Sequence, residues 1–131
     1  MSVRVFEING QEIIARLKVW AEKLSGDKNV LAVVLFGSLV TNEETPASDA
    51  DILILLKESK ERFDDRIPHF IPEKIGIGVD VFPYTLAEFY SSLDENWGMA
   101  REVLKQGVLL YGAGNTEKNR FFRDWFSTLD E

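Results

Sequence analysis

The chain has 131 residues, of which 45% are hydrophobic and 28% are charged, and its formal net charge is −7. This size and balance indicate one globular domain over residues 1–131 rather than a disordered chain, and the acidity argues against duplex DNA or an anionic membrane as a partner. The absence of cysteine excludes disulfides and thiolate metal sites, and neither a membrane span nor a signal peptide is recognisable, so a cytoplasmic location is expected.

The first half of the chain predicts a helix followed by two buried strands. Apolar residues recur at three- and four-residue spacing over residues 11–24, which predicts an amphipathic helix. Residues 29–36 (NVLAVVLF) and 51–56 (DILILL) are continuous apolar runs, as in strands that are covered on both faces. The intervening residues 39–48 are polar, so they are expected to form mainly a loop, with room for a short helix at its start.

The second half predicts further helices that alternate with two more strands. A short helix is expected within residues 58–66, and a third strand, IGVDVFPY, is expected to close at Pro83. Thr85 begins a helix that runs through Leu93, with Glu88 completing a capping box. The remaining expected elements are a helix over 99–105, a strand over 108–111 and a final helix over about 115–129, capped by Asn115 or Thr116. Alternating strands and helices predict an α/β fold, with a sheet flanked by helices.

Two carboxylates and a glycine–serine turn lie at the ends of the first two predicted strands. Asp49 and Asp51 are one residue apart, so both side chains leave the same face of a strand. Carboxylates about 5 Å apart repel by roughly 3 kcal/mol at an effective dielectric near 20, and a hard cation such as Mg²⁺ or Mn²⁺ offsets that repulsion. Gly37 permits a sharp turn close to a ligand, and Ser38 adds a hydroxyl donor for phosphate, beside the first N–H groups of a following helical turn.

Asp80 adds a third carboxylate, at the centre of the otherwise apolar third strand. If this strand lies beside the one that begins near Asp49, the three acids converge. Such a site suits two-metal nucleotidyl transfer, in which cations clamp a triphosphate and one carboxylate activates an attacking hydroxyl. Taken singly, each residue also has a plainer interpretation: a turn at Asp49, a tight-turn glycine at Gly37 and a surface acid at Asp80.

Two other features have ordinary interpretations. His69 is the only histidine and lies in a loop between two prolines, so it is expected to be a surface or packing residue rather than a base. The final helix carries an aromatic stripe that is interpreted mainly as core, with partner binding as the alternative; it comprises Phe121, Phe122, Trp125 and Phe126.

The combined motif resembles that of the DNA polymerase β-like nucleotidyltransferase superfamily, which consists of Gly-Ser, a variable loop, Asp-x-Asp and a distant third Asp. Here Gly37-Ser38, ten residues, Asp49-Ala50-Asp51 and Asp80 follow that pattern. The segments VDVFPYTLAEF and LKQGVLLYG are similar to two segments of its minimal, single-domain branch, the MNT proteins, so the resemblance covers about residues 10–112. It implies a single domain with a nucleotidyltransferase-type mixed β-sheet flanked by helices.

The resemblance also implies a role for each residue of the motif. Asp49 and Asp51 are implied to bind two Mg²⁺ ions, or Mn²⁺ in their place, which hold the nucleotide triphosphate. Asp80 is implied to complete the metal site and to help activate the acceptor hydroxyl. Gly37 and Ser38 are implied to contact phosphate.

The chain departs from the minimal branch just after Gly-Ser. Many members have an Arg-Gly pair there, whereas this chain has Thr41 and Asn42. Threonine cannot supply a guanidinium for phosphate, so either turnover is weak or another cation, such as Lys57 or Arg101, serves.

The implied function is transfer of a nucleoside monophosphate, AMP from ATP or its counterpart from another NTP, to a hydroxyl acceptor. Because no second domain remains to hold the acceptor, it is expected on a partner chain, and minimal members are often paired with a small helical HEPN protein as antitoxin and toxin. The alternative is a catalytically weak or inactive antitoxin that acts as a protein-binding module. An aminoglycoside-type transferase is a weaker alternative, because it normally needs an added helical domain. The sequence leaves the acceptor, the preferred base and the oligomeric state open, a homo-oligomer included.

Overall fold

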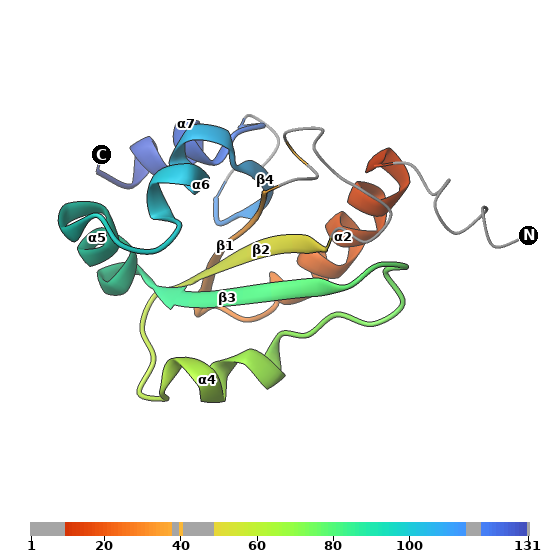
Figure 1. Ribbon diagram of the computed structural model, residues 1–131, viewed down its shortest axis with the longest axis horizontal. Coiled ribbons are helices and arrows are strands. Elements are labelled where there is room, and N and C mark those ends of the chain that lie inside the picture. Colours follow the sequence, from red (N-terminus) through yellow and green to blue (C-terminus); the bar gives the residue numbers. More distant parts are fainter. Residues whose placement is uncertain (1–9, 38–39, 41–48, 115–118, 131) are drawn as a thin grey trace, which may run out of the picture.

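Four strands form one mixed sheet at the centre of the protein, in a computed structural model that describes residues 10–37, 40, 49–114 and 119–130 (Figure 1). In chain order the strands are β1 (Val30–Phe36), β2 (Ala50–Leu56), β3 (Val79–Thr85) and β4 (Val108–Gly112). They lie in the order β3-β2-β1-β4; β1 is antiparallel to β2 and to β4, whereas β2 and β3 are parallel. The predicted α/β fold is therefore confirmed, and it places β2 and β3 side by side.

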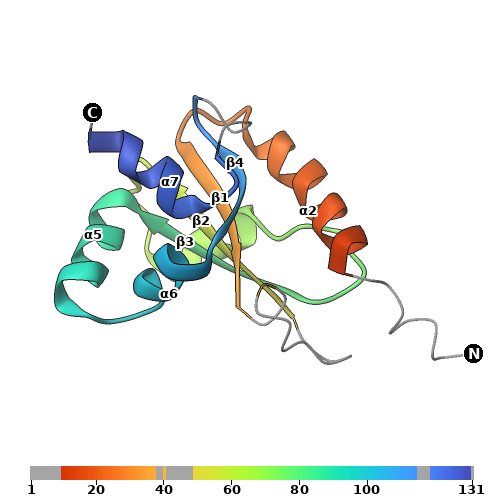
Figure 2. The ribbon, with the colours of Figure 1, turned by 90° about the horizontal axis from the view of Figure 1, so that it is seen from above.

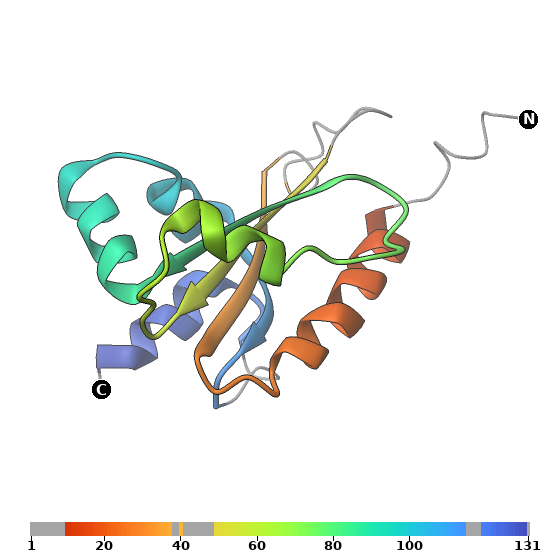
Figure 3. The ribbon, with the colours of Figure 1, turned by 90° about the horizontal axis from the view of Figure 1, so that it is seen from below.

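Helices cover both faces of this sheet. One face carries α2 (Gly10–Leu24) and α4 (Phe63–Arg66), the latter continued by the 3-10 turn η1 (Ile67–His69) (Figure 3). The other face carries α5 (Leu86–Glu95), α6 (Ala100–Gln106) and α7 (Phe122–Ser127), which ends in the 3-10 turn η3 (Thr128–Asp130) (Figure 2). None of the helices in the described ranges combines the length and the apolar composition needed to cross a bilayer.

The two central strands are apolar along almost their whole length because both of their faces are buried. Alternate side chains of β1 and β2 pack against α2 on one face and against α5–α7 on the other. The α2 side includes Ile13, Leu17, Val33, Leu35, Ile52 and Ile54, and the opposite side includes Val34, Phe36, Leu53, Phe89, Val103, Phe122 and Trp125. The continuous runs NVLAVVLF and DILILL were thus correctly interpreted as strands covered on both faces.

Pro83 lies inside β3, so the prediction that it closes the strand is wrong. It pairs with Ile54, and the strand continues for two more residues to Thr85. The sheet tolerates proline here because β3 is an edge strand, with no partner strand on its outer side. The predicted capping box at Thr85 is confirmed: the Glu88 N–H donates to Thr85 Oγ1 at 3.1 Å, and the Thr85 N–H donates to Glu88 Oε1 at 2.8 Å.

Two helices are shorter than expected. The helix expected within 58–66 forms only as α4, from Phe63. The final helix begins at Phe122, because Phe121 is extended and bridges Val108 beside β4. Asn115 and Thr116 lie outside the described residues.

Of the aromatic stripe, Phe122 and Trp125 are buried in the core, whereas Phe121 is 41% exposed. His69 is a surface residue, as expected, with Nε2 lying 3.0 Å from an exposed Glu61 carboxylate.

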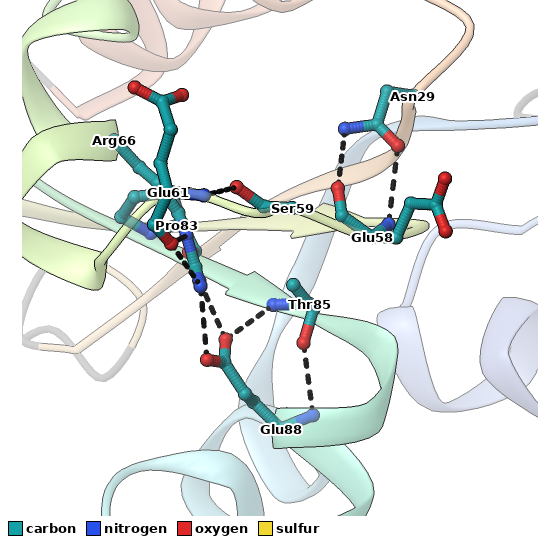
Figure 4. Close-up of polar contacts among 8 residues, drawn as sticks. All are labelled: Asn29, Glu58, Ser59, Glu61, Arg66, Pro83, Thr85 and Glu88. Carbon is teal, nitrogen blue, oxygen red and sulfur yellow. Dashed lines mark hydrogen bonds and ion pairs between the residues drawn. The ribbon is translucent and has the colours of Figure 1, made fainter.

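A buried guanidinium joins the crossover between β2 and β3 to the start of α5 (Figure 4). Arg66 donates from Nη1 to Glu88 Oε1 at 2.6 Å and from Nη2 to Glu88 Oε2 at 3.1 Å. It also donates to Pro83 O at 2.9 Å and, from Nε and Nη2, to Glu61 O. The Arg66 hydrogen bond is the main cause that lowers the pKa of Glu88, and the capping box lowers it further. This network holds the carboxyl end of β3 in place.

Asn29 ties β1 to β2 at the same end of the sheet. Its Nδ2 donates to Glu58 O at 2.8 Å, and its Oδ1 accepts from the Glu58 N–H at 3.2 Å (Figure 4). The Asn29 amide thereby pairs with both backbone groups of Glu58, just past the end of the hydrogen bonds between β1 and β2. Polar contacts therefore fix this end of the sheet, while the opposite end carries the aspartates.

Candidate functional site

Asp51 and Asp80 lie opposite each other where the parallel strands β2 and β3 begin. They are direct register partners, so their side chains leave the sheet on the same side. That side is the one covered by α5–α7, since Leu53 and Phe82, two residues further along each strand, belong to the core beneath those helices. Asp51 is half-buried and Asp80 is exposed. Asp80 is the second residue of β3 rather than its centre, which places its carboxylate at the mouth of the strand pair.

Asp49 lies just outside the first residue of β2 and is exposed. The N–H of Ala50 donates to Gly78 O at 2.9 Å, which extends the pairing of β2 with β3 by one step. A Cβ placed on Gly78 would overlap the carboxylate of Asp49. The side chain of Asp49 therefore lies against the start of β3, at the same end of the sheet as Asp51 and Asp80.

Asp51 is the electrostatic centre of this group. Its pKa is raised above the ordinary aspartate value, first by burial and then by repulsion from the carboxylates of Asp80, Glu102 and Asp49. Three carboxylates, from the residue before β2, from β3 and from α6, thus repel the carboxylate of Asp51. A cation at this position would relieve that repulsion.

Glu102 was missed by the sequence reasoning. It is exposed in the first turn of α6, where glutamate is ordinarily favoured by the helix dipole, so nothing in its local sequence marks it. Only the packing of α6 against the sheet brings it within electrostatic range of Asp51. Its acidity alone does not single it out, because the chain has 22 aspartates and glutamates.

The donor set suits a hard cation that takes most of its ligands from elsewhere. Within the described ranges, no three His, Cys, Asp or Glu side chains are placed to hold a metal ion among themselves. Mg²⁺ is commonly held by one or two carboxylates, with waters and substrate phosphates filling its other positions. The paired carboxylates of Asp51 and Asp80, with Asp49 beside them, fit that manner of binding.

Gly37 brings the turn after β1 against the same carboxylate. Its φ is +86°, and the position where a Cβ would project is filled by Oδ2 of Asp51. The N–H of Val40 donates to Gly37 O at 3.0 Å, so the chain turns sharply here, as the sequence predicted. Ser38, the predicted phosphate donor, lies outside the described residues, as do Thr41 and Asn42.

Gly37→Ala is expected to lower the free energy of unfolding by about 2–3 kcal/mol, because it adds backbone strain and displaces the Asp51 carboxylate. Gly114→Ala is the matched control: its φ is +98°, but a Cβ there would meet nothing within 4 Å. The control should therefore show only the strain, about 1 kcal/mol. Urea unfolding of both variants makes the comparison, and equal losses would contradict the contact between Gly37 and Asp51.

The two cations considered as substitutes for the missing arginine differ in position. Lys57 follows the last residue of β2, a strand that spans about 20 Å, so it lies at the opposite end from Asp51 and cannot serve there. Arg101 precedes Glu102 in the first turn of α6, and its Nη2 donates to Leu93 O at 3.1 Å. Of these two residues, only Arg101 lies on an element near the aspartates.

Comparison with known proteins identifies the same architecture. The chain matches the family described as the nucleotidyltransferase domain over residues 17–110. A crystal structure of a candidate nucleotidyltransferase from Sulfolobus solfataricus is 23% identical, covers 86% of this chain and 87% of its own, and has a TM-score of 0.54. A toxin–antitoxin crystal structure with AMP-PNP is 18% identical, covers 88% and 86%, and has a TM-score of 0.50. No curated protein matches the chain.

These structural similarities are below 25% identity and show a shared fold. The family match shows more than a shared fold, because it covers most of the chain, from α2 into β4. That range includes the glycine turn and both strands beside the aspartates. This protein therefore belongs to the nucleotidyltransferase domain family.

Proposed function

We propose that this protein is a Mg²⁺-dependent enzyme that transfers AMP from ATP to a hydroxyl group of a partner protein. The observation that carries the proposal is the register pairing of Asp51 with Asp80, at the mouth of two parallel strands and beside the turn at Gly37. Family membership supports nucleotidyl transfer as the class of reaction. The nucleotide, the acceptor and the role of each residue are the further content of the proposal.

Each residue has a distinct part in the proposed reaction. Asp49 and Asp51 would hold Mg²⁺ together with triphosphate oxygens, and Asp80 would complete the metal site. Gly37 and Ser38 would hold phosphate. When bound, Mg²⁺ neutralises the triphosphate charge and supports departure of pyrophosphate. Asp80 orients the acceptor hydroxyl and accepts its proton as the oxygen bonds to the α-phosphorus. The bond from the α-phosphorus to the bridging oxygen breaks, and pyrophosphate leaves with that oxygen.

The crowding of acids supports the use of a cation. Asp51 is repelled by Asp80, Glu102 and Asp49, and its burial adds to the cost of its charge. A bound cation would offset this repulsion, which unpaired like charges otherwise impose on the folded protein. Glu102 adds negative potential beside the proposed ligands and thereby strengthens attraction for a divalent ion.

The proposed acceptor lies on a second protein. The neighbour solved with AMP-PNP is a toxin–antitoxin complex, which supports a nucleotide and a protein partner for a chain of this fold. A small helical protein of the HEPN type is the partner we propose.

A second candidate function is that of an antitoxin that only binds and blocks its partner. Thr41 and Asn42 stand where many minimal relatives have Arg-Gly, which favours weak turnover. Both candidate functions involve binding to the same partner, but only the enzyme would transfer AMP to it.

Asp80→Ala is expected to reduce label transfer by about 10²–10⁴-fold, the usual contribution of a positioned acid–base group. The protein, purified with its bound partner, is incubated with Mg²⁺ and ATP labelled at the α-phosphate, and label on the partner is counted. Asp65→Ala is the control, because Asp65 is exposed on α4, on the opposite face of the sheet. A tight complex without any transfer by the unchanged protein would reject the enzyme in favour of the blocking antitoxin.

A further inference from the structure

A groove lies between α2 and residues 71–75, on the face of the sheet opposite the aspartates. The segment that leads from η1 into β3 runs beside α2 (Figures 1 and 3), and the space between them is about 580 Å³. The groove is part of the α2 side of the core, whereas Asp51 and Asp80 face α5–α7. It is therefore separate from the site already described.

The floor of the groove carries two strongly exposed apolar side chains. Ile71 is 57% exposed and Val19 is 56% exposed, the two highest values among the large hydrophobic side chains described. Both line the groove, together with the half-buried Trp20, whose ring packs on the core beneath. Exposed apolar side chains that gather in one concavity mark a binding surface, whereas scattered ones do not.

A hydrogen bond from a side chain to the backbone holds the groove in shape. Nη1 of Arg16 on α2 donates to Ile75 O at 2.9 Å, which fixes the segment against the helix. Lys74 has a φ of +60°, a conformation that glycine adopts without cost and lysine does not. Strained backbone of this kind clusters at binding sites, where it directs a side chain that a glycine would lack.

The rim is basic although the protein is acidic. Arg16, Lys23 and Lys74 line the groove with one carboxylate, Glu73, in a chain whose formal net charge is −7. Neither Lys23 nor Lys74 has an ion-pair partner within the described residues. These two cations are therefore available to an anionic occupant.

We propose that this groove binds an acidic, amphipathic segment of a partner protein. Its apolar side chains would cover Val19, Trp20 and Ile71, and its carboxylates would lie over Lys23 and Lys74. Such a partner matches both the floor and the rim, which a helix-in-groove mode of recognition requires. Because the groove and the aspartates are on opposite faces, a protein bound here leaves the nucleotide site open.

Two other occupants fit less well. A nucleic acid would meet the exposed aliphatic side chains of Val19 and Ile71, which stack poorly on bases, while Trp20 is half-buried against the core. The net charge of −7 would also repel its phosphates. A second copy of this chain carries the same net charge, and a contact between the groove and a different surface of the copy would not close into a dimer. Both remain distinguishable outcomes of the test.

The test uses the ¹⁵N-labelled full chain and a synthetic 14-residue peptide, with leucine at helical i, i+3, i+4 and i+7 spacing and glutamate elsewhere. Saturable amide shifts confined to α2 and residues 71–75 are expected, and Lys23→Glu with Lys74→Glu should weaken binding at least 10-fold. Lys57→Glu with Lys105→Glu is the control of equal charge change and should leave the affinity unchanged, because both lysines are exposed outside the groove.

Three kinds of result would overturn the proposal. The first is the absence of saturable shifts in the groove, or equal binding of the same peptide with glutamine in place of glutamate. The second is binding of single-stranded RNA at α2 with higher affinity than the peptide. The third is concentration-dependent self-association of the unchanged chain, seen by sedimentation and lost in Val19→Ser with Ile71→Ser. None of these results depends on nucleotide transfer, so the proposed function is tested separately.

Discussion

Asp51→Asn is expected to reduce transfer of AMP by more than about 100-fold and, at the same time, to stabilise the metal-free protein. The loss of transfer follows from removing a proposed metal ligand. Even the residues that only support a metal ligand, when mutated, lower metal affinity or activity by roughly 10- to 100-fold. The gain in stability follows from removing a charge that burial, Asp80, Glu102 and Asp49 all oppose. A cross-strand pair of like charges costs up to about 1 kcal/mol, so the melting temperature should rise by about 4 °C.

The pH dependence of this gain has a definite sign. The raised pKa of Asp51 means that the folded protein holds its proton more tightly than the unfolded chain does. The free energy of unfolding of the unchanged protein therefore falls as the pH rises from the ordinary value of 3.8 through the raised folded value. Asp51→Asn should be the more stable protein at pH 7 and equal to the unchanged protein below pH 3.8.

Thermal unfolding with and without Mg²⁺ checks both halves of this prediction. Mg²⁺ should stabilise the unchanged protein and leave Asp51→Asn nearly unaffected, because an ion stabilises only the folded state that binds it. Asp65→Asn removes an equal charge from an exposed position on α4 and should change neither transfer nor the response to Mg²⁺. A variant at Asp51 that melts at a lower temperature than the unchanged protein at pH 7 would mean that the carboxylates do not repel.

Arg66→Met should lower the free energy of unfolding by about 3 kcal/mol, or about 10 °C in melting temperature. Arg66 is only 4% exposed, and removal of its guanidinium leaves Pro83 O and Glu61 O without their donor. Glu88 contributes less to the loss, because its side chain is 38% exposed and water can solvate it. The expected loss of about 3 kcal/mol is therefore at the lower end of the range of about 3–5 kcal/mol for breaking a buried ion pair.

Arg62→Met provides the matched control, since Arg62 is exposed in the same crossover and its side chain makes no cap contact. It should leave the melting temperature within about 2 °C of the unchanged protein. Because the pKa of Glu88 is lowered, the stability from its pair with Arg66 is present above the ordinary value of 4.5 and is lost as the pH falls through the folded value. The deficit of Arg66→Met should accordingly shrink in acid, and a deficit equal to that of Arg62→Met would contradict the network.

Local patterns predicted most of the elements and the motif. The apolar runs of β1 and β2, the capping box at Thr85 and the sharp turn at Gly37 each depend on neighbours within a few residues. Such features are set by backbone sterics, periodicity and short-range hydrogen bonds, which a sequence displays directly. The spacing of Asp49 and Asp51 placed both acids at one strand end for the same reason.

Elements whose limits depend on distant contacts were predicted less well. Pro83 continues β3 instead of closing it, because the sheet order leaves that strand at an edge. The final helix starts only at Phe122, because residues 120–121 make backbone contacts along β4. Lys57 fits as a phosphate cation in the sequence, yet the direction of β2 carries it to the wrong end of the sheet.

By itself the sequence determined the α/β class, the glycine turn and a pair of aspartates at the start of a strand, since those follow from local geometry and residue chemistry. Only the tertiary structure decided that β3 lies parallel to β2 with Asp80 opposite Asp51, and that α6 brings Glu102 near them. Strand order and helix docking arise from burying two faces of one sheet at once, which joins residues far apart in the chain. Patterns within a few residues of the sequence do not show which strands and helices become neighbours.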